Sequence, residues 1–397
     1  MLSRDIRVEI NTKSWKTKPR PVWAKSAHSL HSVDIGQALL LLGTITTPNG
    51  ISVSSPERYW ACVRYFSACA NTGDLRIRAP FSSLDPHQKS ILSDDFGVAI
   101  STTWLINMLG GVKEVVDGRQ FMLNMGTKRK AKKPAAVGPS KCPDFVLEDL
   151  QGKLHVLECK GTQSGRKYLD RAINAGVAQK KGIKIAKTLR GEALVIGLTL
   201  ANERSAHGSQ LVVVDPQPRP LTVVSESSRI EVAEVMARLR LARALSLSGF
   251  SSLGLEISLP KQVRPPDAEF GLLTFVEKSR LAISPTERRH IWHDDTRSEL
   301  RDADLRTVDG FLVQTMHFEL PSIILDSGEL ARRVTVRRGI EAGLVNRLAE
   351  AGSNLRDRAN SEAADLAVAN KGIALKSTEN TTRLEYPDFF FGEIIFD

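Results

Sequence analysis

The clearest alternation of apolar and polar residues lies near the middle of the chain. The runs 145–149 and 154–160 are apolar and are separated by a short connection that contains a glycine, so they predict an antiparallel hairpin. Because a strand has a period of two residues, Glu158 and Lys160 project from one face of the second strand. Cys159 projects from the opposite face, where a small buried thiol is expected.

Other patterns place elements on both sides of this hairpin. Ser93 is expected to cap a helix that ends near residue 110, with Asp94 and Asp95 in its first turn. Asp117 and Gly118 predict a tight turn between two strands. The expected elements around the hairpin are strands at 112–116 and 119–125, a helix at 167–186, and strands at 193–200 and 211–215. This order predicts an α/β unit.

The flanking parts of the chain have a different character. The first part predicts a strand at 6–10, a helix at 35–42 that Asp34 caps, and a helix at 56–70. The last part predicts an apolar helix from 228 to 249, further helices up to 369, and strands near the end. We therefore expect an N-terminal α+β extension (1–90), a central α/β domain (91–227) and a mixed, mainly helical C-terminal domain (228–397).

Composition and charge point to a polyanionic partner. The chain has 397 residues, of which 42% are hydrophobic and 25% charged, and a formal charge of +10. The excess of positive charge lies in residues 1–230, while residues 231–397 carry a net negative charge. A basic surface favours nucleic acid. Since no apolar run reaches membrane-spanning length, a soluble, cytoplasmic protein without a membrane partner is expected.

Three side chains of the hairpin region suit hydrolysis of phosphodiesters. Asp144 precedes the first strand, and its carboxylate and that of Glu158 are oxygen ligands of the kind that Mg²⁺ or Mn²⁺ takes. Lys160 follows on the same face as Glu158, where its amine can orient or help to deprotonate a metal-bound water. Metal-assisted hydrolysis is the chemistry that these groups suit.

The same residues resemble the motif of a known family. Pro143-Asp144 matches the PD element and Glu158-Cys159-Lys160 matches the (D/E)XK element of the PD-(D/E)XK nuclease superfamily, whose restriction-endonuclease-like fold has an αβββαβ core. The resemblance covers roughly residues 91–216. It implies that Asp144 and Glu158 bind the metal together with the backbone carbonyl of Cys159, and that Lys160 lies beside the attacking water.

The resemblance also implies supporting residues. An acid near the start of the first helix often helps to hold the metal in this superfamily; Asp95 is the best match and Asp94 the next, although both are also ordinary residues for a helix start. A polar residue of the helix after the motif often faces the site, which suggests Gln179 or Lys180. The residues expected to contact the phosphate backbone are Lys128, Arg129, Lys130, Lys132, Lys133, Lys180 and Lys181. A solvated linker or a localisation signal would have the same composition as the basic run 127–141, but its place directly before Asp144 favours phosphate contact.

We therefore expect a Mg²⁺-dependent nuclease, most simply a DNA endonuclease of restriction, repair or antiviral (anti-phage) defence. One alternative is a catalytically silent nuclease-fold module that binds nucleic acid or serves as the interaction subunit of a larger complex. Another is a non-nuclease subunit in which the Glu-Cys-Lys triplet is a coincidence. The C-terminal domain (228–397), whose net charge is negative, is expected to contact a protein partner or a second copy of the chain.

Overall fold

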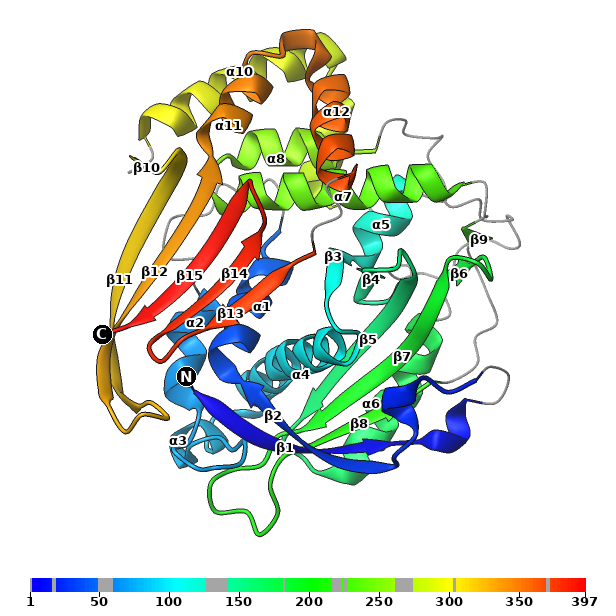
Figure 1. Cartoon of the computed structure of the whole chain (residues 1–397), viewed down its shortest axis with the longest axis vertical. Coiled ribbons are helices and arrows are strands. Elements are labelled where there is room, and N and C mark those ends of the chain that lie inside the picture. Colours follow the sequence, from blue (N-terminus) through cyan, green and yellow to red (C-terminus); the bar gives the residue numbers. More distant parts are fainter. Residues whose placement is uncertain are drawn as a thin grey trace.

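The computed structural model describes most of the chain. The described residues are 2–15, 19–48, 60–125, 142–180, 183–215, 223–224, 228–260, 274–302, 305–368 and 372–397. Within these ranges the protein is mixed α/β with two large sheets (Figure 1). Among the helices in these ranges, none combines the length and the apolar character needed to cross a membrane.

The first large sheet has seven strands and contains the predicted hairpin. Its strands, in spatial order, are β2 (His28–Asp34), β1 (Ser3–Ile10), β8 (Gln210–Val214), β7 (Arg190–Thr199), β5 (Leu154–Thr162), β4 (Phe145–Asp149) and β3 (Val112–Asp117). Strands β3, β4 and β5 are antiparallel neighbours, whereas β5 and β7 run parallel. A helix, α6 (Arg166–Lys180), makes the crossover between β5 and β7.

The second large sheet is antiparallel and is built entirely from the last third of the chain. Its six strands, in spatial order, are β10 (Arg306–Val308), β11 (Phe311–Ile324), β12 (Leu330–Glu341), β15 (Phe390–Phe396), β14 (Thr381–Tyr386) and β13 (Ala374–Ser377). A pair of two-residue strands, β6 (Lys184–Ile185) and β9 (Val223–Val224), forms a separate small ladder.

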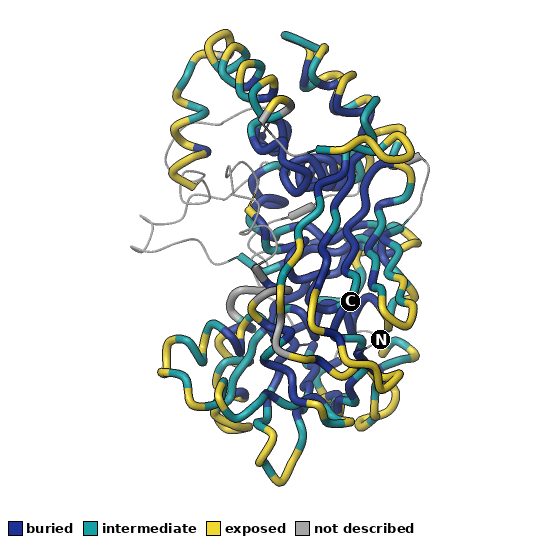
Figure 2. Tube along the Cα trace, turned by 90° about the vertical axis from the view of Figure 1, so that its left-hand side faces the viewer, coloured by how far each residue is buried: buried dark blue, intermediate teal, exposed yellow. Residues whose placement is uncertain are grey.

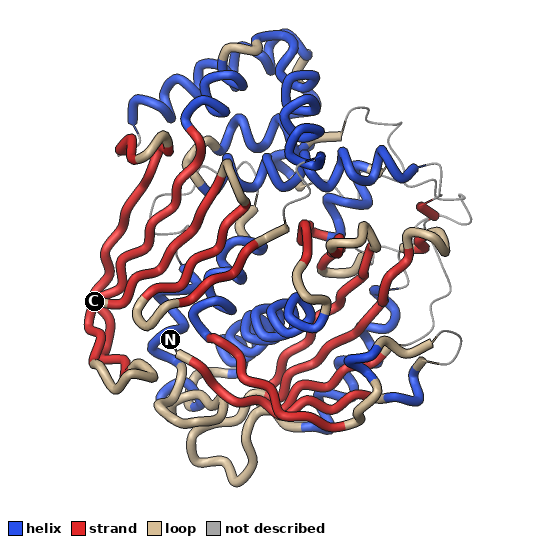
Figure 3. Tube along the Cα trace, in the orientation of Figure 1, coloured by secondary structure: helices blue, strands red, loops and turns tan. Residues whose placement is uncertain are grey.

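Helices fill the space between the sheets and cover one end of the molecule. Helix α4 (Pro86–Met108) packs on β5 and β7 of the first sheet, and α1 (Ile35–Thr46) packs on α4 and on β14 and β15 of the second. Figure 3 shows the remaining helices of the C-terminal part gathered beyond the ends of both sheets. These are α7 (Arg229–Leu247), α8 (Ser251–Ser258), α9 (Phe275–Ala282), α10 (Pro285–Asp302), α11 (Ala342–Ala349) and α12 (Leu355–Val368).

One apolar core joins the two sheets. Buried residues of α1, α4, β5 and β15 belong to the same hydrophobic cluster, and Figure 2 shows the buried chain continuing between the sheets. Helix α6 covers the other face of the first sheet through Leu169 and Ile173. The two sheets therefore share a core, and the first sheet also has strands on both sides of the boundary expected at residue 90.

Helix α4 lies unusually close to the strand that carries Glu158 and Lys160. A Cβ atom at Gly97 of the helix would come within 2.8 Å of the backbone oxygen of Lys160, and one at Gly161 would overlap the carbonyl of Ser93. Real Cβ atoms do not approach other atoms so closely, and both positions therefore require glycine. The contact fixes α4 against the end of β5.

Several predicted elements are confirmed. The hairpin of β4 and β5 forms in antiparallel register. Asp34 caps α1 by accepting a hydrogen bond of 3.1 Å from the backbone N–H of Gln37, although the helix continues to Thr46. The apolar helix expected from residue 228 is α7, and the strands expected at 193–200 and 211–215 are β7 and β8.

Other predictions are wrong at their boundaries or in their type. Helix α4 begins at Pro86 with Asp85 as its N-cap, so Ser93, Asp94 and Asp95 lie inside the helix. Residues 119–125 are not a strand, because Asp117 caps the short helix α5 (Gly118–Asn124).

The predicted helix at 167–186 ends at Lys180 and is followed by β6. In the described part of the predicted helix at 56–70, α2 (Trp60–Tyr65) gives way to a 3₁₀ turn. Residues 330–341, expected to be helical, form β12.

Candidate active site

The hairpin brings Asp144 beside Glu158 and Lys160. Asp144 immediately precedes β4, and the antiparallel pairing of β4 with β5 places it next to the last part of β5. The backbone N–H of Cys159 donates a hydrogen bond of 2.8 Å to Oδ2 of Asp144. The carboxylate is thereby held against the backbone of β5, at the residue between Glu158 and Lys160.

Glu158 and Lys160 form an ion pair under helix α6. Nζ of Lys160 lies 2.5 Å from Oε1 of Glu158, whose side chain is fully buried, whereas that of Lys160 is 20% exposed. A Cβ atom at Gly176 of α6 would lie 3.0 Å from Cγ of Glu158 and 3.2 Å from Cε of Lys160, so this glycine leaves room for both side chains. The buried Oε2 atom of Glu158 has no hydrogen-bond partner within the described residues.

Burial makes both carboxyl groups hold their protons more tightly. Desolvation, followed by the charge of Asp144, raises the pKa of Glu158 to about 8, even though Lys160 opposes this change. Desolvation also raises the pKa of Asp144, with smaller contributions from Asp117 and Asp94. Two neighbouring buried carboxyl groups cannot both ionise cheaply without a cation between them.

The donor set fits a hard divalent cation. Glu158 presents an oxygen that no described residue hydrogen-bonds, and Asp144 is held beside it. Carboxylate oxygens are the ligands that Mg²⁺ and Mn²⁺ accept. Within the ranges that the structure describes, no three His, Cys, Asp or Glu side chains form a preassembled metal cluster. The protein therefore offers two carboxylates, and Mg²⁺ usually keeps several waters besides so few protein ligands.

The structure turns Asp95, the preferred acid of the first helix, toward other partners. The hydroxyl of Tyr65 donates a hydrogen bond to Asp95, and burial raises the pKa of this carboxyl. Asp94, the second choice, is instead the helix acid whose charge acts on Asp144. The structure brings together Asp144, Glu158 and Lys160. Of the two helix acids, Asp94 interacts electrostatically with Asp144, whereas Asp95 is hydrogen-bonded to Tyr65.

The remaining predicted residues are placed only in part. Gln179 and Lys180 belong to α6 and follow Gly176 by three and four residues, which is the spacing of one helical face. Gly176 contacts the ion pair, but the side chains of Gln179 and Lys180 are not among those that the structure describes, so their part in the site stays a prediction. The basic residues outside the described ranges are Lys128, Arg129, Lys130, Lys132, Lys133 and Lys181.

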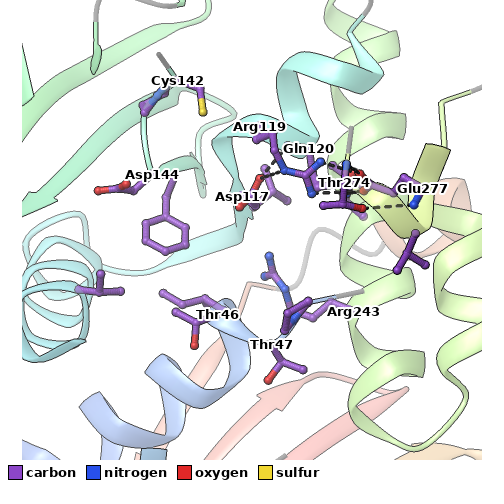
Figure 4. Close-up of a pocket in the computed structure, with 18 residues that line it drawn as sticks. Thr46, Thr47, Asp117, Arg119, Gln120, Cys142, Asp144, Arg243, Thr274 and Glu277 are labelled. Carbon is purple, nitrogen blue, oxygen red and sulfur yellow. Dashed lines mark hydrogen bonds and ion pairs between the residues drawn. The ribbon is translucent and has the colours of Figure 1, made fainter. Parts of the chain in front are cut away.

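A cavity beside Asp144 was not predicted. It has a volume of about 560 Å³ and lies between β3, α5, α7 and α9, with Asp117 and Asp144 in its wall (Figure 4). Asp117 accepts a hydrogen bond of 2.7 Å from the backbone N–H of Gln120 and keeps 46% of its side chain exposed. The Asp117-to-Gln120 spacing is that of a helix start, and this signal could have identified the residue as a cap instead of a turn.

Comparison with known proteins adds no relative from which a role could be transferred. The chain matches no protein-family model, no curated protein and no solved structure.

Proposed function

We propose that the protein is a metal-dependent nuclease that hydrolyses phosphodiester bonds, with DNA as its substrate. The observation that carries this proposal is the fully buried carboxyl of Glu158, next to the oriented carboxylate of Asp144. Oε1 of Glu158 is paired with Lys160, and its Oε2 has no hydrogen-bond partner among the residues that the structure describes. A fold gains nothing in stability from such a group. A metal ion bound there would offset the cost of burying the carboxylate and would use it as a ligand.

The arrangement of the strands supports the same proposal. An antiparallel series of three strands, β3, β4 and β5, follows helix α4, and a helical crossover then leads to the parallel strand β7. This order is compatible with the αβββαβ core that the motif resemblance implies, with α5 as an addition between β3 and β4. The carboxylates lie beside each other at the open end of the hairpin of β4 and β5.

Each residue has a distinct role in the proposed reaction. Asp144 and Glu158 would hold the metal ion, which when bound activates a water and offsets the charge of the phosphate. The N–H of Cys159 points toward Asp144, and the carbonyl of the same strand residue points to the same side, where it can add a third oxygen. The Glu158 charge keeps the pKa of Lys160 raised although burial opposes this, so Lys160 is a cation that stabilises negative charge at the attacking water.

A cleavage assay tests the proposal. Purified protein is incubated with supercoiled, linear and single-stranded DNA and with RNA, in Mg²⁺, Mn²⁺ or EDTA. Cleavage is expected with either metal and not with EDTA, and the variants Asp144→Asn, Glu158→Gln and Lys160→Ala should lose at least about a hundredfold in rate. Glu148→Gln is the matched control, because Glu148 of β4 pairs with Lys113, 3.5 Å away, instead of with the site.

The result that contradicts the proposal is equally clear. If no substrate is cut with either metal, the chain is a silent nuclease-fold module or an interaction subunit, and its role in restriction, repair or defence has to be sought through a partner. If cleavage occurs but survives all three site substitutions, the active site lies elsewhere.

A further inference from the structure

We propose that the cavity beside Asp144 binds one unpaired guanine base of the nucleic-acid substrate. The inference rests on the proposed nuclease function, because it names the part of the substrate that enters next to the reacting phosphate. It assigns a task to residues outside the motif, and it explains why helices of the C-terminal part lie against the site.

The walls of the cavity suit a flat ligand with apolar faces. Its volume of about 560 Å³ is within the range of small-molecule sites and leaves room for a base with its sugar. Val98, Val116, Leu239 and Val276 provide apolar surface, and Phe145 provides an aromatic ring. Bases that leave a stack are held between apolar and aromatic side chains in this way.

The polar edge of the cavity selects the base. Oδ1 of Asp117 accepts the capping hydrogen bond of α5, so this carboxylate is fixed in position while 46% of its side chain stays exposed. Guanine is the base whose pairing edge carries two adjacent donors, N1–H and N2–H, which fit a carboxylate. Adenine and cytosine have a ring-nitrogen acceptor at that edge, and thymine or uracil places a carbonyl on each side of its single N–H.

A second residue restrains the position of that carboxylate. Nη1 and Nη2 of Arg119 lie 2.8 and 3.2 Å from the carboxylate oxygens of Glu277 in α9, while its Nε lies 3.9 Å from Oδ1 of Asp117. Glu277 is itself fixed, because Thr274 caps α9 in a reciprocal capping box with it. Figure 4 shows this chain of contacts running from Glu277 to Asp117 along one wall of the cavity. The C-terminal part thus sets the edge that reads the base.

The cavity adjoins the reacting groups. Asp117 of β3 is paired with Phe145 of β4, and the backbone N–H of Gly118 donates a hydrogen bond of 2.9 Å to the carbonyl of Asp144. A base held by Asp117 therefore belongs to a nucleotide near the phosphate at Asp144. The donors that Asp117 reads are those that guanine uses in a base pair, and so the base must be unpaired when it binds.

Binding without metal tests this inference separately from cleavage. A fluorescently labelled 12-mer of thymidines with one central guanosine is titrated in EDTA, together with 12-mers that carry inosine or an abasic site at that position. Inosine lacks the N2 amino group, so the intact protein should bind the guanosine 12-mer about tenfold more tightly than the inosine 12-mer. Ribonucleotide versions of the same 12-mers show whether the base comes from DNA or RNA.

Two variants and one control complete the test. Asp117→Asn keeps the helix cap and should reduce the guanosine-to-inosine preference to less than twofold, whatever it does to overall affinity. Val276→Trp fills the cavity from its exposed side and should lower binding of the guanosine 12-mer to the level of the abasic one. Asp85→Asn makes the same charge change at the cap of α4, outside the cavity, and should keep the full preference.

The outcomes separate the two proposals. Equal binding of the guanosine, inosine and abasic 12-mers by the intact protein overturns the base pocket, even if the protein cuts DNA with Mg²⁺. A preference that Asp117→Asn leaves in place overturns the assigned role of Asp117. A guanine preference in EDTA without cleavage in any metal supports the pocket and contradicts the nuclease.

Discussion

The buried carboxyl of Glu158 should make the metal-free protein less stable as the pH rises. The variant Glu158→Gln has nearly the same shape but cannot ionise. In an unfolded chain a glutamate titrates near its model value of 4.5, whereas burial and Asp144 raise the pKa of Glu158 in the fold to about 8. A raised pKa means that the contribution of the group to stability is complete below about pH 4.5 and is lost as the pH rises through about 8.

The magnitude follows from the two pKa values. Their difference corresponds to roughly 5 kcal/mol between the two protonation states above pH 8. The pKa of about 8 already includes the attraction of Lys160 for the ionised form, but the variant Glu158→Gln loses this ion pair, and that loss offsets part of its gain. We therefore expect Glu158→Gln to be more stable than the natural protein by about 2–4 kcal/mol at pH 8, and to differ little from it at pH 5.

Urea unfolding at pH 5, 6, 7 and 8 in EDTA measures this difference. Glu114→Gln is the control, because burial raises the pKa of Glu114 to about 7. The contribution of Glu114 is therefore lost mainly as the pH rises from about 4.5 to about 7, and most of the slope between pH 7 and 8 should persist in that variant. Mg²⁺ should stabilise the natural protein most at pH 8, because the Glu158 carboxyl must lose its proton before it binds the metal and does so more easily at that pH. The ion should stabilise Glu158→Gln much less. The reasoning is refuted if the natural protein and Glu158→Gln show the same pH dependence.

Two further substitutions test the surroundings of the site. Gly161→Ala should cost several kcal/mol or prevent folding, because its Cβ would overlap the carbonyl of Ser93 and push α4 from β5, whereas Gly73→Ala, where nothing lies within 4 Å, should be nearly neutral in thermal unfolding. Arg119→Met should destabilise the protein by about 3 kcal/mol in urea unfolding, because the carboxylate of Glu277, buried in the fold, loses its two short contacts. A loss below about 1 kcal/mol would mean that water or another group solvates Glu277.

Local patterns in the sequence were sufficient for the hairpin and for the grouping of its reactive side chains. The period of a strand places Glu158 and Lys160 on one face, and the short connection sets the pairing that brings Asp144 beside them. Both features depend on residues fewer than twenty positions apart. Asp34 at the start of α1 was predictable for the same reason, since a helix cap acts on the next few residues.

Elements whose type depends on distant neighbours could not be assigned in this way. Residues 330–341 form a strand because β11 and β15 pair with them on both sides. Strand β1 joins the first sheet beside β8, about two hundred residues later in the chain. No local pattern indicates that the hydroxyl of Tyr65, on another helix, donates a hydrogen bond to Asp95, the acid that the resemblance favours over Asp94.

The sequence by itself therefore determined which candidate residues come together, since one hairpin region holds Asp144, Glu158 and Lys160. Only the tertiary structure decided how far those groups are buried, which oxygen has no partner among the described residues, and which cavity opens beside them. Burial and cavities arise where segments remote in the chain meet, as α5, α7 and α9 do around Asp117. No local pattern of residues specifies such a meeting, because it results from the packing of the whole core.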